Sequence, residues 1–432
     1  MKILLLGINF APELTGTGKY TGEMAAWLAA RRHQVRVVCA PPYYPQWAVS
    51  PPYVANAWRR EHWQGVEVWR CPLWVPGRPG GAKRLLHLAS FALGSLPVML
   101  RQVLWRPDAV WVVEPALFCA PAALLAARLS GAKAWLHIQD YEVDAAFDLG
   151  LLKGPWLKRW VLAAERWLMR RFDVVSTISR RMLERAATKG VAPGALRYFP
   201  NWVNLAHYAL PSPDGVAAYR QELGIAPCAV VALYSGNMGG KQGLWVLAEV
   251  ARSCARRAKP EQSADPSNAQ TATQAEEMVF VFCGDGAGRA DLVQRCLGLP
   301  NVRFLDLQPA QRLPDLLAMA DVHLLPQRAD AADLVMPSKL TGMLASARPV
   351  VATAHIGTEL ATVVQTCGLV VPPEDPQAFA AALCTLAADP AMRERLGAAA
   401  LLHAHAHMDK EAVLARFESD LIALVAKPQL SK

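Results

Sequence analysis

Short runs of apolar residues alternate along the chain with longer stretches in which apolar side chains recur every three or four positions. The first pattern is typical of buried strands in a parallel sheet, and the second of helices packed on that sheet. At the start of the chain, the apolar runs at 3–8 and 34–40 flank a helical stretch at 20–31, which predicts a βαβ unit. The same alternation resumes at residue 230. The pattern therefore predicts an α/β protein with two Rossmann-like domains.

The length of 432 residues also exceeds what one compact core usually holds. The stretch Arg197–Asn204 is expected to leave the first domain, and the proline-rich Pro211–Gly215 to act as a linker. We therefore expect domains at 1–204 and 205–395, followed by C-terminal helices at 396–432 that can cross back to the first domain. The polar segment Arg256–Glu277 lacks apolar periodicity and is expected to be a surface insert.

The positive charge of the chain is concentrated in its first half. Residues 1–200 contain 26 Lys and Arg against 13 Asp and Glu, and the whole chain has a net charge of +9. Such asymmetry favours an anionic partner for this half, such as a membrane surface, a lipid diphosphate or a nucleic acid. No RNA- or DNA-binding module accompanies the charges, so a nucleic-acid partner is not expected. The nine cysteines lack metal-ligand spacing, and the apolar start is too short for a signal peptide, so we expect a cytoplasmic protein.

Two segments of the first half favour contact with a membrane surface. Leu85–Leu100 contains no charged side chain but is shorter than the roughly 20 residues that span a bilayer. It is either a core helix or an interfacial helix. Lys153–Arg171 carries three tryptophans and six Lys and Arg on one expected helix, a composition that suits anionic lipid headgroups. We therefore expect peripheral association with the inner membrane.

Polar residues at the end of one expected strand are candidates for catalysis. His137 and Asp140 end the apolar run Ala134–Asp140, and ligands of open α/β sheets bind at the carboxyl ends of the strands. A histidine can donate a hydrogen bond to a sugar hydroxyl, and a carboxylate can accept a proton from an acceptor hydroxyl. A structural role for His137 is the alternative. Glu142 and Asp144 are weaker candidates for the carboxylate.

Two glycine-rich turns and one loop–helix junction are candidate phosphate sites. Gly16-Thr17-Gly18 lies in an expected loop at 9–19, where a plain tight turn is the alternative. Gly236–Gly243 has four glycines in eight residues, which permits close approach of the backbone to a phosphate. In Asp333–Thr353, a polar turn is expected to enter a helix at Pro337-Ser338 with Lys339 in its first turn. This is either one more βα unit or an anion site at a helix N-terminus.

The stretch PSKLTGMLASARPVV, from Pro337 to Val351, resembles the donor-site helix of family 4 glycosyltransferases of the GT-B fold. Within that family, ADLVMPSKLT is similar to transferases of colanic acid synthesis that are thought to use GDP-fucose. The resemblance implies two Rossmann-like domains facing across a cleft, the first for the acceptor and the second for the nucleotide sugar. It implies donor contacts at Gly16, Thr17, Gly18, Gly236, Asn237, Gly239, Lys241, Gly284, Pro337, Ser338, Lys339, Leu340 and Glu359.

This sequence departs from the family pattern at two places. The family usually carries two glutamates seven residues apart, and neither is present here: the second, which holds the ribose, is replaced by Gly342, and the first falls near Asp333 or Leu334. An arginine and a lysine of the glycine loop are replaced by Asn237 and Gln242. Lys241 and Lys339 would then supply the positive charge.

The resemblance implies a retaining transferase without a metal or other cofactor. It would move a hexosyl group, fucosyl from GDP-fucose in the favoured case, to a saccharide on undecaprenyl diphosphate during exopolysaccharide synthesis. Transfer of a UDP-linked N-acetylhexosamine and a sugar-nucleotide epimerase are alternatives. A non-catalytic assembly partner is a further alternative, motivated by the missing glutamates.

Overall fold

The computed structural model describes residues 1–13, 16–77, 80–114, 117–141, 154–209, 211–257, 278–329 and 336–426. The chain divides into two compact units. The first contains residues 1–201 together with 411–432, and the second contains residues 202–410. Helix α16 (Lys410–Ala426) therefore belongs almost entirely to the first unit.

The first unit is built on an eight-stranded sheet with the order β3-β4-β2-β1-β5-β6-β7-β8. Its strands are β1 (Lys2–Leu6), β2 (Gln34–Cys39), β3 (Arg59–Trp63), β4 (Val66–Arg70), β5 (Ala109–Glu114), β6 (Lys133–Ile138), β7 (Val174–Thr177) and β8 (Leu196–Tyr198). Every neighbouring pair is parallel except β3 and β4, which form an antiparallel pair at one edge. The strand order reverses between β1 and β5, which is where ligands of open α/β sheets bind.

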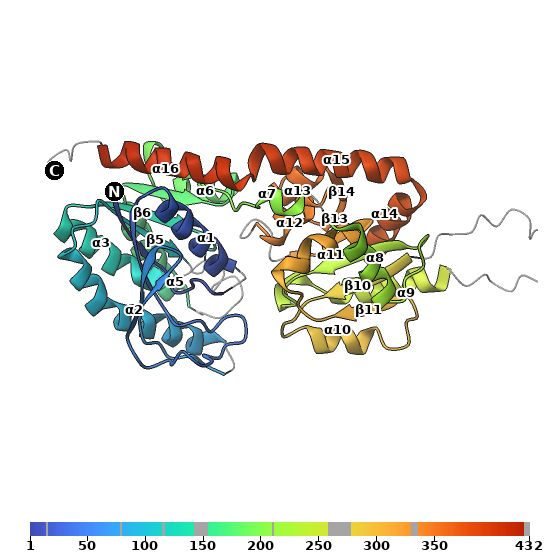
Figure 1. Ribbon diagram of the computed structural model, residues 1–432, viewed down its shortest axis with the longest axis horizontal. Helices are drawn as coiled ribbons and strands as arrows, with labels where there is room; N and C mark the ends of the chain where they lie inside the picture. The colour runs from blue at the N-terminus through green and yellow to red at the C-terminus, as the bar shows by residue number, and fades with distance from the viewer. Residues whose placement is uncertain are drawn as a thin grey trace, which may run out of the picture. The chain divides into compact units, whose positions relative to one another are not determined.

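The helices of the first unit cover both faces of this sheet (Figure 1). They are α1 (Gly16–Ala30), α2 (Gly81–Val103), α3 (Ala120–Ser130), α5 (Pro155–Met169), α6 (Arg180–Thr188) and α16. The connections through α2, α3, α5 and α6 all advance in one direction across the sheet, and the connection through α1 runs in the other. Because parallel crossovers are right-handed, the first four helices share one face, and α1 lies on the opposite face.

Helix α16 packs beside α1. The Glu418 carboxylate accepts hydrogen bonds from Arg31 Nε at 2.8 Å and pairs with His33 Nε2 at 2.8 Å. Trp27 Nε1 donates to the Glu411 carboxylate at 2.8 Å, and the Phe417 ring stacks on Phe199 at 4.6 Å. The last helix of the chain is therefore an integral part of the first unit.

The second unit has a six-stranded parallel sheet with the order β11-β10-β9-β12-β13-β14. Its strands are β9 (Val230–Ser235), β10 (Met278–Cys283), β11 (Val302–Leu305), β12 (Val322–Leu325), β13 (Val350–Thr353) and β14 (Gly368–Val371). Its helices are α7 (Leu205–Tyr208), α8 (Pro213–Glu222), α9 (Trp245–Arg257), α10 (Arg289–Arg295), α11 (Leu313–Met319), α12 (Lys339–Ala345), α13 (Glu359–Val364), α14 (Pro376–Ala388) and α15 (Pro390–His407). Buried aromatic rings, including Phe280, Phe282 and Phe379, fill one side of the sheet.

The apolar run Leu85–Leu100 lies within α2, which runs without a break from Gly81 to Val103. The helix expected at Tyr20 begins at Gly16, so the Gly16-Thr17-Gly18 segment lies in the first turn of α1 and not in a loop. No helix within the described ranges has the length and apolar character needed to cross a bilayer.

Candidate active site

The carboxyl ends of β9 and β12 mark the point at which the strand order of the second sheet reverses. Gly236 directly follows β9, and the connection from β12 leads to α12. A ligand of an open parallel sheet binds at such a reversal, because the two loops diverge there and leave a crevice. The candidate donor site is therefore built from the loops after β9, β10 and β12.

The loops after β9 and β10 approach each other so closely that glycine is required. Gly236 and Gly284 have φ angles of +129° and +142°. A Cβ atom on Gly284 would lie 2.0 Å from the carbonyl oxygen of Gly236. A Cβ atom on Gly286 would lie 2.6 Å from Asn237 Oδ1. Any side chain here would displace the adjacent backbone, so these glycines shape a turn at the sheet edge.

Lys339 places its ammonium group against this turn. Its Nζ donates a hydrogen bond to the Tyr234 hydroxyl at 2.8 Å and lies 4.0 Å from the centre of the Tyr234 ring. The Tyr234 hydroxyl in turn donates to the carbonyl oxygen of Asn237 at 2.6 Å. A Cβ atom on Gly236 would lie 3.5 Å from Lys339 Cδ, an ordinary van der Waals distance, so the lysine side chain packs directly against this turn.

Burial strongly shifts the pKa values of both Lys339 and Tyr234. Lys339 as a residue is half-buried, but its ammonium end lies in the interior, and this burial lowers the pKa of Lys339 to about 7. Burial raises the pKa of the Tyr234 phenol, which stays protonated. A lysine poised between its two charge states gains a full charge when an anion binds beside it. The arrangement can therefore bind a phosphate and respond to it electrostatically.

The N-terminus of α12 differs from the expectation. The helix begins at Lys339, one residue after Ser338, and has only seven residues. The Leu340 amide donates to the Pro337 carbonyl at 3.0 Å, and the Thr341 amide to the Ser338 carbonyl at 3.3 Å. Leu340 is fully buried in the core. The amides of Leu340 and Thr341 thus have partners in the turn, which weakens the expected anion site at this N-terminus. The candidate group for contact with an anion is the Lys339 ammonium.

The remaining expected donor residues lie on neighbouring loops. Gly239 precedes the short turn Gly240–Gln242 that contains Lys241, whose side chain lies outside the described part of the structure. Glu359 is the first residue of α13, whose N-cap Thr358 accepts a hydrogen bond from the Ala361 amide. These positions follow β9 and β13, so they share the carboxyl edge of the sheet with Lys339.

In the first unit, Gly18 contacts Glu13, a residue not anticipated from the sequence. A Cβ atom on Gly18 would lie 2.8 Å from Glu13 Oε2, so this glycine lets the first turn of α1 close on the carboxylate. Gly16 has a φ of +61°, and Thr17 Oγ1 lies 3.5 Å from Asn9 Oδ1. The three residues therefore lie at the carboxyl end of β1, beside the reversal of strand order.

His137 is held within the protein. It is 2% exposed, its Nδ1 lies 2.9 Å from Ser176 Oγ, and its Nε2 lies 3.0 Å from Gln139 Nε2. Because the Gln139 amide donates to Nε2, the hydrogen of the neutral ring lies on Nδ1 and is donated to Ser176. Burial lowers the pKa of His137 to about 3. With both nitrogens bonded internally, direct donation to a sugar hydroxyl, the expected role, is not supported.

Asp140 lies two residues beyond β6 and is partly exposed. It is thus placed at the carboxyl edge of the sheet. Glu142 and Asp144, the other candidate carboxylates, lie outside the described residues.

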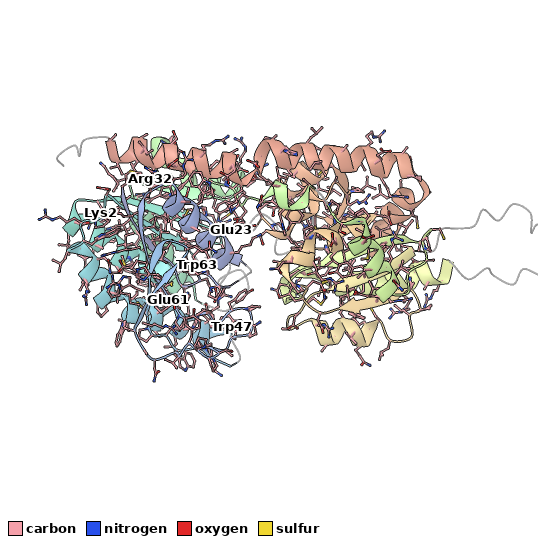
Figure 2. The ribbon with its side chains drawn as sticks, viewed as in Figure 1. Lys2, Glu23, Arg32, Trp47, Glu61 and Trp63 are labelled. Atoms are coloured by element: carbon pink, nitrogen blue, oxygen red, sulfur yellow. The ribbon has the colours of Figure 1, made fainter. Side chains whose placement is uncertain are left out.

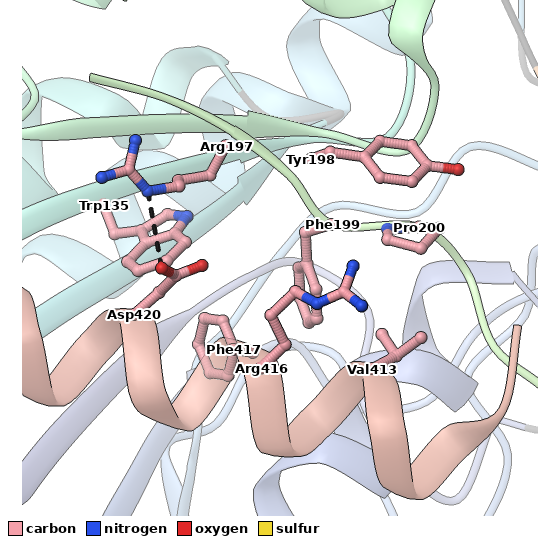
Figure 3. Close-up of a pocket in the computed structure, with 9 residues that line it drawn as sticks. All are labelled: Trp135, Arg197, Tyr198, Phe199, Pro200, Val413, Arg416, Phe417 and Asp420. Carbon is pink, nitrogen blue, oxygen red and sulfur yellow. Dashed lines mark ion pairs between the residues drawn. The ribbon is translucent and has the colours of Figure 1, made fainter. Parts of the chain in front are cut away.

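A pocket also forms in the first unit between β8 and α16 (Figure 3). It is lined by Trp135, Arg197, Tyr198, Phe199, Pro200, Val413, Arg416, Phe417 and Asp420, and Arg197 Nε lies 3.6 Å from the Asp420 carboxylate. Its free volume of about 10 Å³ holds about one water molecule. The pocket is therefore too small for a sugar or a nucleotide.

Two Rossmann-like units, one with a buried lysine against a glycine turn at its strand reversal, define the class of GT-B glycosyltransferases. Comparison with known proteins supports this class and identifies the family. Residues 15–202 match the model of the glycosyl transferase 4-like domain, and residues 230–389 match that of glycosyl transferases group 1. The chain belongs to this family of glycosyltransferases, which confirms the resemblance found in the sequence.

One relative is similar over nearly its full length. The putative colanic acid biosynthesis glycosyl transferase WcaI of Escherichia coli K12 is 43% identical over 430 residues, covering 98% of this chain and 100% of that protein. Among solved structures, sucrose-phosphate synthase from Thermosynechococcus elongatus has a TM-score of 0.73 at 17% identity, with 99% and 100% of the two chains covered. WaaG, a glycosyltransferase involved in lipopolysaccharide biosynthesis, has a TM-score of 0.65 at 16% identity, with 98% and 100% covered. These structures confirm the GT-B fold.

Proposed function

We propose that this glycosyltransferase acts in exopolysaccharide synthesis. It transfers a hexosyl group, fucosyl from GDP-fucose in the favoured case, to a saccharide linked to undecaprenyl diphosphate, with retention at the anomeric carbon. The extended similarity to a putative colanic acid transferase supports the pathway. The ADLVMPSKLT stretch, which resembles transferases thought to use GDP-fucose, supports the donor.

The position of Lys339 is the observation that carries the proposal. Bond cleavage adds one negative charge to the terminal phosphate of the nucleoside diphosphate, and a preorganised cation lowers the barrier by stabilising this charge as it develops. Lys339 Nζ lies against the Gly236 turn and donates to the neutral Tyr234 hydroxyl. A phosphate that replaces or joins this contact finds a cation that has no acidic partner among the described residues. Lys339 then performs the charge stabilisation for which other transferases use a divalent metal.

Asp140 is the carboxylate that we propose for the acceptor side. It follows β6 at the edge of the first sheet, where it can accept the proton of an acceptor hydroxyl. His137 acts indirectly in this proposal. Its Nε2 accepts from Gln139, which also donates to Asn201 Oδ1 at 3.0 Å, so the histidine fixes the polar segment that leads to Asp140.

A lipid-linked acceptor requires the enzyme to reach a membrane surface, and α2 and α3 offer a suitable face. Leu86, Leu93 and Leu100 recur at seven-residue intervals along α2, and Leu93 is 72% exposed. Helix α3 packs beside α2 and adds exposed Leu125 and Leu129 (Figure 1). Exposed leucines in a row are unusual on a protein surface and mark an interaction site.

Basic residues accompany this leucine face, and α5 extends it. Lys83, Arg84 and Arg101 on α2 are exposed, as expected for contact with anionic headgroups. Trp156 on α5 is 77% exposed, and Trp160 and Trp167 are also exposed, whereas Glu165 is turned inward to pair with Lys189. Because α2, α3 and α5 cover the same face of the sheet, we propose that this face docks reversibly on anionic lipid.

The donor is tested by thermal stabilisation of the protein with GDP, UDP and ADP in buffer containing EDTA. The proposal predicts a rise in Tm with GDP, and a smaller rise at the same GDP concentration for the Lys339→Met variant. A rise with UDP alone would contradict the GDP-fucose donor and favour N-acetylhexosamine transfer or epimerisation. No response to any of the three nucleotides would contradict catalysis at this site and favour an assembly partner.

A further inference from the structure

Glu13 is a buried carboxylate between β1 and α1. It is 6% exposed, and its Oε1 accepts hydrogen bonds from the backbone amides of Tyr43 and Tyr44, both at 3.0 Å. Its Oε2 accepts from Asn9 Nδ2 at 2.9 Å. Burial raises the pKa of Glu13, whereas these three donors and nearby Arg70 favour the charged form. A buried carboxylate is costly unless its lone pairs are satisfied, so this geometry is strongly determined.

Arg70 ties the same two loops from the opposite side. This last residue of β4 is 2% exposed and donates to the carbonyl oxygens of Ala11, before Glu13, and Ala40, after β2. Its Nε donates to the Glu61 carboxylate at 2.8 Å. Figure 2 shows Glu61 on β3, in the hairpin that Arg70 completes. The loop after β1 and the loop after β2 are thus joined by one acidic and one basic side chain.

The loop after β2 carries aromatic side chains that are fixed at its other end. The Tyr43 ring packs edge-on against Trp47, with centroids 5.6 Å apart, and against His87 of α2 at 4.8 Å. Trp47, labelled in Figure 2, also lies 5.2 Å from the His87 ring. Tyr44 and Trp47 remain partly exposed. The loop therefore presents two aromatic side chains whose backbone is held by Glu13 on one side and α2 on the other.

We propose that Glu13 is a positioning residue for the acceptor. It fixes the loop 41–48 as an aromatic platform on which a sugar ring of the acceptor packs at the carboxyl edge of the first sheet. Sites for small molecules typically combine such rigid aromatic walls with a few polar groups. The inference rests on the proposed transferase function, because it assigns the acceptor subsite of that reaction. Gly16, Thr17 and Gly18, which are expected to contact the donor, lie beside Glu13, so GDP binding and the KM for the acceptor are measured separately.

The test compares Glu13→Ala, Glu13→Gln and Tyr44→Ala with the unmodified protein. Transfer is measured from radiolabelled GDP-fucose to a butanol extract of bacterial membranes. GDP binding is titrated in parallel, and its stoichiometry gives the number of folded sites. Glu13→Ala is expected to raise the apparent KM for the extract at least about tenfold, because two buried amides lose their acceptor and the loop shifts. Glu13→Gln is expected to restore most of the loss, since its amide oxygen can accept the same two bonds.

Tyr44→Ala keeps the backbone amide and the carboxylate, so it is expected to raise KM without lowering Tm. GDP affinity should be unchanged in Tyr44→Ala, which leaves Glu13 and its contact with Gly18 in place. Activity that falls only in proportion to the folded sites, with KM unchanged, would overturn the role of Glu13 while leaving the transferase function intact. Absence of transfer by the unmodified protein, despite GDP binding, would overturn both.

Discussion

Replacing Lys339 by methionine removes the charge from the candidate donor site while preserving most of the side-chain volume. A hydrogen bond to a charged group is worth about 1.5–3 kcal/mol, and 1.4 kcal/mol corresponds to a tenfold change in Kd. Loss of one such bond to a phosphate should therefore raise the Kd for GDP by roughly 10- to 140-fold. Because Lys339 has no acidic partner within the described part of the chain, its replacement leaves no carboxylate unpaired there, and the fold itself should tolerate the change.

The pH dependence of binding tests the same group more sharply. Burial lowers the pKa of Lys339 to about 7, so half of the molecules carry the charge at pH 7. At pH 8.5 the charged fraction falls to about 3%, and affinity scales with the competent fraction, so the Kd should rise about 16-fold between these pH values.

Isothermal titration of GDP in EDTA, in buffers that differ in ionisation enthalpy, measures both quantities. Binding at pH 7 to the unmodified protein should take up about half a proton, and binding to Lys339→Met should take up none. Tyr234→Phe, which keeps the ring and removes the hydroxyl, is the matched variant that separates the charge from its local partner. Equal affinity of Lys339→Met and the unmodified protein, or a Kd independent of pH in both, would refute the reasoning.

Three further outcomes follow from the same structure. The pKa of Lys339 is lower in the folded protein than the usual value near 10.4, so the unfolded chain binds more protons between pH 7 and about 10. Calorimetry should therefore show that the unfolding free energy of the unmodified protein increases relative to that of Lys339→Met as the pH rises through this window. Gly284→Ala should cost more than about 2 kcal/mol of unfolding free energy in urea, because its Cβ would lie 2.0 Å from the Gly236 carbonyl at a φ of +142°, whereas an alanine at exposed Gly194 should be neutral. Leu93→Asp should reduce sedimentation of the protein with vesicles containing anionic lipid, without changing GDP binding. Ile422→Asp on α16, which lies on the opposite face of the sheet, is the control, and an equal loss of sedimentation in both variants would contradict docking through α2 and α3.

The regular elements were largely predictable because their patterns are local. The run Val230–Ser235 forms β9 with the expected bounds, since six consecutive apolar or small residues suit a strand buried on both faces. The helix start at Gly16 was missed, because Gly18 is fixed by contact with Glu13 and not by helix propensity.

The candidate site was only partly predictable. Lys339 was expected from the loop–helix pattern, but its partner Tyr234 lies 105 residues earlier and inside a strand that reads as uniform core. Glu13 has a weak signal, a lone acid after an apolar strand, and its partners Tyr43 and Tyr44 come from the next loop. His137 illustrates the converse, since a position at a strand end suggested chemistry while Ser176 and Gln139 satisfy both ring nitrogens.

The most direct test of the proposed function is transfer of labelled fucose from GDP-fucose into the butanol-soluble lipids of bacterial membranes, in EDTA. We expect the unmodified protein to incorporate labelled fucose, and Lys339→Met to incorporate at least about tenfold less. Incorporation from a UDP-linked sugar, with none from GDP-fucose, would contradict the donor. Incorporation undiminished in Lys339→Met would contradict the central role given to this lysine.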